Sequence, residues 1–80
     1  MRVEKYLAAM TDPDTGEKPL RTGTFARWCG VDRRNFYHLE SVGWVGCTSD
    51  TAYRIVETTK QNPTPRGGTV TLRDLVKEEV

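Results

Sequence analysis

Residues 24–43 read TFARWCGVDRRNFYHLESVG, and this stretch decides the fold. Ala26 lies four positions before Gly30, where its small side chain lets a following helix approach closely. Gly30 can adopt the left-handed conformation that ends a helix. Phe36 and Leu39 come six and nine positions after the glycine and are expected to face back toward the core. This spacing predicts a helix-turn-helix, in which two helices pack across a tight turn.

The two helices of this pair have recognisable starts and apolar faces. Thr22 or Thr24 can cap the earlier helix, and Asp32 can cap the later one, which covers roughly residues 33–42. The apolar faces are expected to hold Phe25, Ala26 and Cys29 in the earlier helix, and Phe36, Leu39 and Val42 in the later one.

Three more short helices are predicted outside the pair. The first covers roughly residues 2–10, the fourth opens at Ser49 and Asp50, and the fifth follows a capping-box pattern of Thr71 with Asp74. Their apolar positions are Val3, Tyr6, Leu7 and Met10, then Ala52, Ile55, Val56 and Thr59, then Leu72, Leu75 and Val76. We therefore predict a single all-α domain of five helices over residues 1–80.

The positive charge of the chain is concentrated in its middle. The 80 residues have a net charge of only +1, but residues 21–73 carry eight Lys or Arg against four Asp or Glu, which gives +4. A central basic region suits a polyanionic partner.

No stretch is long and apolar enough for a membrane span or a signal peptide, so we expect a cytoplasmic protein with reduced thiols and no membrane partner.

The outer side of the helix at 33–42 carries donors and an aromatic ring. At about 100° per residue, Arg33, Arg34, Tyr37, His38 and Ser41 span about 140° of its surface. Arginines at the start of a DNA-recognition helix can reach guanine edges. We therefore expect Arg33, Arg34, Tyr37 and His38 to contact the bases of DNA. The expected contacts to the DNA backbone are Arg21, Thr22, Thr24, Arg27, Asn35 and Ser41. The plainer interpretation is an ordinary solvated face.

Metal and catalytic interpretations are weaker. Cys29, His38 and Cys47 are evenly spaced, but a structural zinc normally has four ligands, often in close pairs. The acidic segment DPDTGE at 12–17 is similar to a calcium loop, yet Gly23 stands where the bidentate Glu is needed. His38 has no evident Ser or Cys nucleophile. We expect no metal, no cofactor and no enzymatic activity.

The order of these segments resembles the Cro/lambda-repressor-like helix-turn-helix superfamily, and is most similar to the small Cro-like (YdaS-type) prophage regulators. The matching stretches are VEKYLAA, FARWCGVDRRNFYHLES, TAYRIVETT and GGTVTLRDL. The resemblance implies a five-helix, phage-type repressor or autoregulator that binds a palindromic double-stranded DNA operator as a homodimer. Two departures are the long loop at 11–23 and Thr22-Gly23 in place of the usual Thr-Gln, whose glutamine commonly holds a phosphate.

Two other functions are compatible with parts of the sequence. A small helical domain can be a protein-interaction module or an inhibitor of a host enzyme. The chain also resembles the MerR/excisionase winged helix, in which AYRIV at 52–56 is a strand, so the secondary structure of residues 51–60 decides that alternative. For a homodimer, the expected surface runs from Trp44 through the fourth helix to TVTLRDLV at 69–76.

Overall fold

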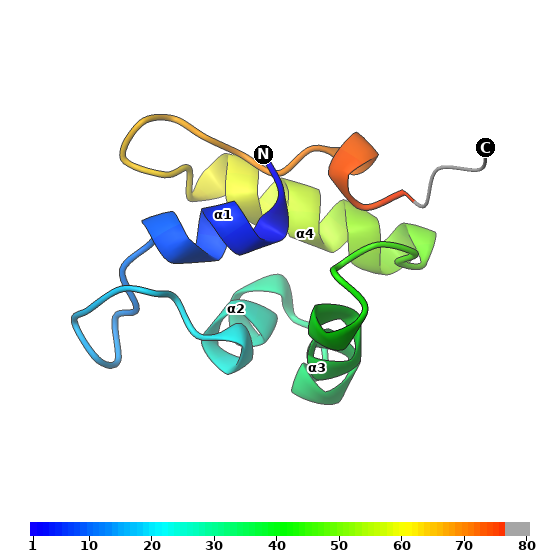
Figure 1. The fold of residues 1–80 in the computed structure, drawn as a ribbon, viewed down its shortest axis with the longest axis horizontal. Coiled ribbons are helices and arrows are strands. Elements are labelled where there is room, and N and C mark those ends of the chain that lie inside the picture. The colour runs from blue at the N-terminus through cyan, green and yellow to red at the C-terminus, as the bar shows by residue number, and fades with distance from the viewer. Residues whose placement is uncertain (77–80) are drawn as a thin grey trace.

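The computed structural model describes residues 1–76. Within that part of the chain all regular secondary structure is helical, and loops connect the helices. The elements are α1 (Val3–Ala9), α2 (Thr22–Cys29), α3 (Arg33–Ser41), α4 (Ser49–Gln61) and the single 3-10 turn η1 (Leu72–Asp74). Figure 1 shows α1 and α4 in an upper layer and the pair α2 and α3 below them. Because residues 51–60 lie in α4, the winged-helix alternative, which needs a strand there, is wrong.

The turn between α2 and α3 has the geometry that the sequence predicts. Gly30 is left-handed, with φ 70° and ψ 32°, and its N–H donates to the carbonyl oxygens of Ala26 and Arg27. The Asp32 carboxylate then caps α3 by accepting the Arg34 N–H at 2.9 Å. The cap predicted for α2 is wrong, because its N-cap residue is Arg21 and neither nearby threonine caps it.

Four aromatic rings form the centre of the core. Phe25 lies in the middle, with ring centroids 5.5 Å from Tyr6, 5.5 Å from Phe36 and 6.3 Å from Trp44. Each of the four side chains is at most 1% exposed. The Tyr6 hydroxyl also donates to the Asn62 carbonyl at 2.6 Å, which joins α1 to the end of α4. The core therefore joins all four α-helices.

The predicted fifth helix and three predicted apolar-face positions are wrong. The C-terminal segment makes only the turn η1, so residues 1–76 contain four α-helices, not five. Leu75 is buried, but Leu72 and Val76 are more than half exposed, and Val42 after α3 is 48% exposed. The chain before η1 is extended, and the Thr59 hydroxyl holds it there by accepting the Val70 N–H at 3.0 Å, so the C-terminal segment forms only the short turn.

The capping-box residues nevertheless pair as predicted. The Asp74 carboxylate accepts the Thr71 N–H at 2.9 Å and the Thr71 hydroxyl at 2.7 Å. It also accepts the Met1 ammonium at 3.3 Å, so the two ends of the described chain are joined. Burial would raise the pKa of Asp74, but these hydrogen bonds and the ammonium charge outweigh it and lower the pKa.

Candidate nucleic-acid interface

The first turn of α3 presents two neighbouring arginines at the surface. Arg33 and Arg34 begin the helix, both side chains are exposed, and no acidic residue accompanies them in that turn. Positive charge at a helix N-terminus opposes the helix dipole, at a cost of up to about 1 kcal/mol per charge at an exposed site. The stability of the helix therefore does not explain why these two residues are arginines.

The exposed side of α3 divides into strips that face different neighbours. Arg33 and Tyr37, one turn apart, line a hollow shared with α2. Asn35 and His38 line a separate hollow shared with the start of α4. Arg34 lies between these strips, as a rotation of about 100° per residue requires. The four residues expected to read bases thus lie on one continuous outer surface of α3.

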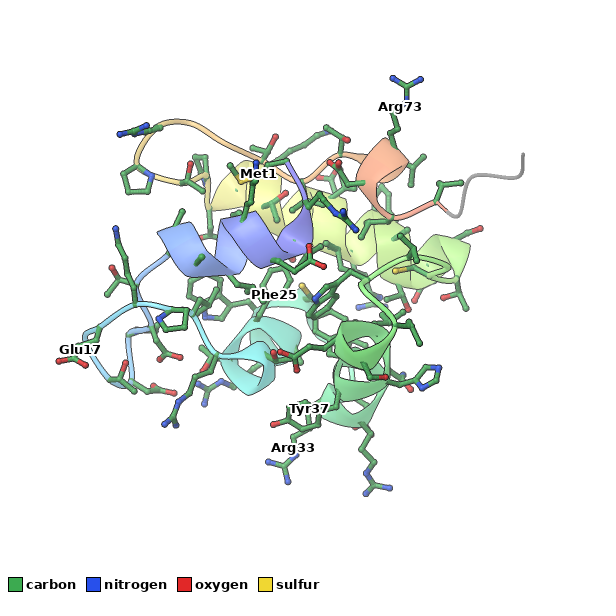
Figure 2. The ribbon with its side chains drawn as sticks, viewed as in Figure 1. Met1, Glu17, Phe25, Arg33, Tyr37 and Arg73 are labelled. Atoms are coloured by element: carbon green, nitrogen blue, oxygen red, sulfur yellow. The ribbon has the colours of Figure 1, made fainter. Side chains whose placement is uncertain are left out.

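The hollow between α2 and α3, called here the basic hollow, collects three arginines. Its volume is about 500 Å³, and it is lined by Asp14, Arg21, Gly23, Thr24, Ala26, Arg27, Val31, Arg33 and Tyr37. Figure 2 shows Arg33 and Tyr37 together at the end of the molecule opposite to Arg73. The structure therefore brings Arg21 and Arg27, expected at the DNA backbone, next to two expected base-reading residues.

Gly23 has a packing role at the edge of the basic hollow. The Tyr37 hydroxyl oxygen lies over the first turn of α2, 3.4 Å from where a Cβ on Gly23 would stand. A Cβ at position 23 would therefore stand in contact with this hydroxyl. The Thr22-Gly23 pair thus accompanies a tyrosine that crosses from α3 onto α2.

A buried carboxylate fixes the loop before α2. The Asp12 side chain has no exposed surface, and it accepts the backbone N–H groups of Asp14 at 2.8 Å and Arg21 at 3.0 Å. It also accepts the Thr24 hydroxyl at 3.0 Å. Burial alone would raise the pKa of Asp12, but these hydrogen bonds, with Arg21 foremost, outweigh it and lower the pKa. Sequence reasoning missed this role, although an Asp followed by Pro-Asp is a known local signal for such a turn.

The neighbouring Asp14 pairs with one of the three arginines. Its carboxylate lies 2.7 Å from the Arg27 guanidinium, and both side chains are more than half exposed. Arg21, Arg33 and Arg34 form no ion pair within residues 1–76. The loop therefore neutralises one of the charges in the basic hollow and leaves the other two free.

Three of the polar residues expected at the DNA backbone are engaged elsewhere or buried. Thr22 and Thr24 are 8% and 6% exposed, and the Thr24 hydroxyl belongs to Asp12. Ser41 is exposed, but its hydroxyl donates to the His38 carbonyl at 2.7 Å. The two threonines are buried and therefore do not lie on the outer surface. A local sequence pattern could not show their burial beside Asp12, because Asp12 lies ten or more positions before them in the chain.

Of the two cysteines, Cys29 lies apart from this surface, whereas Cys47 lines the hollow that also holds Asn35 and His38. Cys29 is buried where α2 meets α4, and burial raises the pKa of its thiol to about 11. Cys47 is half-buried, and its pKa is raised by burial as well. In the described part of the chain, no three His, Cys, Asp or Glu side chains gather in a way that could hold a metal ion. Within the same residues, no helix is both long and apolar enough to cross a membrane.

Comparison of the chain with protein-family models, with curated proteins and with solved structures gave no match.

Proposed function

We propose that this protein is a sequence-specific DNA-binding regulator with a lambda-repressor-like fold, which reads the major groove with α3. The observation that carries the proposal is the set of arginines without ion pairs in and beside the basic hollow. Arg33 and Arg34 are exposed at the start of α3, and Arg21, from the chain entering α2, lines the basic hollow together with Arg33. Their charges are uncompensated, and two of them oppose the helix dipole, so a polyanion is the partner that suits them best.

The proposed division of labour follows the strips of α3. Arg33, Arg34, Tyr37 and His38 contact base edges, because they occupy the outer surface that would enter the groove. Arg21 and Arg27 contact phosphates from α2, the helix that crosses the backbone in a helix-turn-helix complex. Asn35 is exposed beside His38 and contacts the adjacent strand's backbone.

The deciding experiment selects bound sequences from random duplex DNA and then compares two double variants. Arg33→Ala/Arg34→Ala removes two exposed arginines from α3. Lys5→Ala/Arg66→Ala is the matched control, because it removes two exposed positive charges that have no ion pair within residues 1–76 and lie outside both the basic hollow and the proposed dimer surface.

The α3 variant should lose its preference for the selected duplex over a scrambled one, whereas the control variant should keep it. Both variants change the net charge equally, so non-specific attraction cannot explain a difference. Selection of no sequence at all, or equal behaviour of the two variants, would refute the proposal and favour a protein-interaction module.

We further propose that the regulator acts as a homodimer on a palindromic site. One recognition helix reads only a few base pairs, and a two-fold dimer places two such helices about 34 Å apart, one turn of DNA. The support is a set of apolar side chains on the α4 and η1 side: Tyr53 is 64% exposed, Leu72 56% and Val76 53%. Trp44, expected at this surface from the sequence, is buried in the core and does not belong to it.

A further inference from the structure

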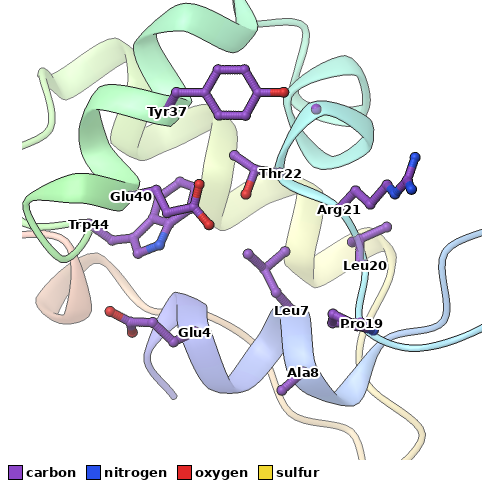
Figure 3. A pocket seen from close by; sticks show the side chains of 11 residues that line it. Glu4, Leu7, Ala8, Pro19, Leu20, Arg21, Thr22, Tyr37, Glu40 and Trp44 are labelled. Carbon is purple, nitrogen blue, oxygen red and sulfur yellow. The ribbon is translucent and has the colours of Figure 1, made fainter.

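A second hollow, between α1, α2 and α3, has features that DNA binding does not use (Figure 3). Its volume is about 610 Å³, within the usual range of ligand sites. The floor is apolar and comes from Leu7, Ala8, Pro19 and Leu20. We call it the Trp44 hollow, after the side chain that lines one end of it.

Trp44 offers this hollow an unused hydrogen-bond donor. The residue is only 1% exposed, and its indole N–H donates to no acceptor within residues 1–76. In Figure 3 the indole nitrogen lies on the side of the ring that faces the hollow. No buried side-chain nitrogen or oxygen in the described residues is without a partner, so this N–H is open to solvent in the hollow and is not buried and unpaired. An occupant that brought an acceptor oxygen would supply a partner for it.

Two carboxylates stand at the same end as Trp44. Glu4 comes from α1 and Glu40 from α3, whereas Arg21 lies at the other end of the hollow (Figure 3). Glu40 forms no ion pair in the described part of the chain. Glu4 has one exposed contact, 3.7 Å from the Arg2 guanidinium. This end of the hollow therefore attracts a positively charged group.

We propose that the Trp44 hollow binds a lysine or arginine residue of a partner polypeptide. One such residue supplies all three complements at once: a backbone carbonyl for the Trp44 N–H, methylene groups for the apolar floor, and a cation for Glu4 and Glu40. A simple amine lacks the carbonyl, and a neutral residue lacks the charge. The proposal does not rest on DNA binding, so each can fail without the other.

The test follows the two tryptophan indole signals of ¹⁵N-labelled protein by NMR. The probe is N-acetyl-arginine methylamide, with the citrulline analogue as its neutral match and agmatine as the cation without a carbonyl. Trp28 does not line the hollow and serves as the internal reference, assigned with Trp28→Phe. The arginine probe should shift the Trp44 signal with a dissociation constant on the order of millimolar, as suits a single residue. The two analogues should bind more weakly, and the Trp28 signal should stay in place.

Variants then locate the charge. Glu4→Gln and Glu40→Gln should each weaken the arginine probe by about 2- to 5-fold, as an exposed ion pair allows. Glu17→Gln is the control, because this exposed glutamate lies in the loop outside the hollow and should change nothing. The proposal is overturned if the Trp44 signal does not move at concentrations of the arginine probe up to about 10 mM, tenfold above a dissociation constant of about 1 mM. It is also overturned if citrulline binds as well as arginine.

Discussion

Arg34 lies at a helix position where its positive charge is unfavourable. Its charge opposes the dipole of α3, and alanine is the better helix former. We therefore expect Arg34→Ala to leave the thermal midpoint of unfolding unchanged or slightly raised. The same change should reduce the preference for the selected duplex by about 1–3 kcal/mol. Calorimetry and fluorescence anisotropy measure the two effects separately, and an equal loss on selected and scrambled duplexes would rule out base reading by this residue.

Asp12 gives the protein part of its sensitivity to acid. Its folded-state pKa is lowered, so its contribution to stability is present above the unfolded pKa of about 3.9 and is lost as the pH falls through the lower folded value. We expect Asp12→Asn to lower the urea midpoint at pH 7 and to flatten its decline below about pH 5. Asp74, whose pKa is also lowered, should keep some of that decline in the variant.

The control for this prediction is Asp14→Asn. It removes an exposed carboxylate from the same loop and leaves the buried one in place. Urea titrations from pH 7 to about pH 3 compare the three proteins across the relevant range. An Asp12→Asn protein that follows the acid decline of the parent would contradict the assignment.

Single residues were predictable where their partners are close in sequence. Asp32 caps a helix two positions away, and Gly30 needs only its own freedom at positive φ, so both were predicted correctly. Asp12 reaches Thr24 across twelve positions, which no local pattern reveals. Trp44 is a similar case: it is a core residue with φ 68°, which is unusual for a bulky side chain, and only the surrounding packing holds it there.

At the scale of elements, the four α-helices were predictable because each has an apolar stripe that meets the core. Tyr6, Phe36 and Ile55 are each completely buried on the stripes predicted for α1, α3 and α4. The C-terminal segment has the same spacing, but only Leu75 finds a place in the core. Periodicity shows which residues could share a helix face, and it cannot show whether a surface remains for that face to cover.

The loop before α2 should restrain DNA binding through Asp14. Its carboxylate holds the Arg27 guanidinium, the group proposed to contact a DNA phosphate, at 2.7 Å. We expect Asp14→Asn to tighten binding to all duplexes alike and to steepen the slope of log K against log salt by up to about one unit. Glu17→Gln, in the same loop but without an ion pair in the described residues, should have a smaller effect. Unchanged affinity and slope in Asp14→Asn would show that Arg27 does not contact DNA.

At the scale of the whole molecule, a substitution at Phe25 tests whether the domain unfolds as one cooperative unit. Its ring contacts side chains from α1, α3 and the chain after α3. We expect Phe25→Ala to cost about 3–5 kcal/mol, a large part of the about 5–15 kcal/mol that stabilises a small domain. Far-ultraviolet circular dichroism and tryptophan fluorescence should shift together to lower urea. Phe25→Leu should be milder, and separate transitions would contradict a single cooperative core.

Dimer formation is the second prediction at this scale. Tyr53→Glu adds a charge at an exposed apolar position of α4, and Gln61→Glu adds the same charge at an exposed polar position of the same helix. We expect sedimentation to show two parent chains per palindromic duplex, weakened assembly for Tyr53→Glu and parent-like assembly for Gln61→Glu. One chain per duplex at saturation, on a selected site without palindromic symmetry, would contradict the dimer.

Because the two cysteines are unequally buried, their rates of reaction with a thiol reagent report how often the core opens. A thiol reacts as its thiolate, so Cys29, with a pKa raised to about 11 where α2 meets α4, is protected both sterically and chemically. Cys47 is nearer the surface. Under a thiol reagent at neutral pH, Cys47 should label first, and the delay before Cys29 labels then measures how rarely α2 separates from α4.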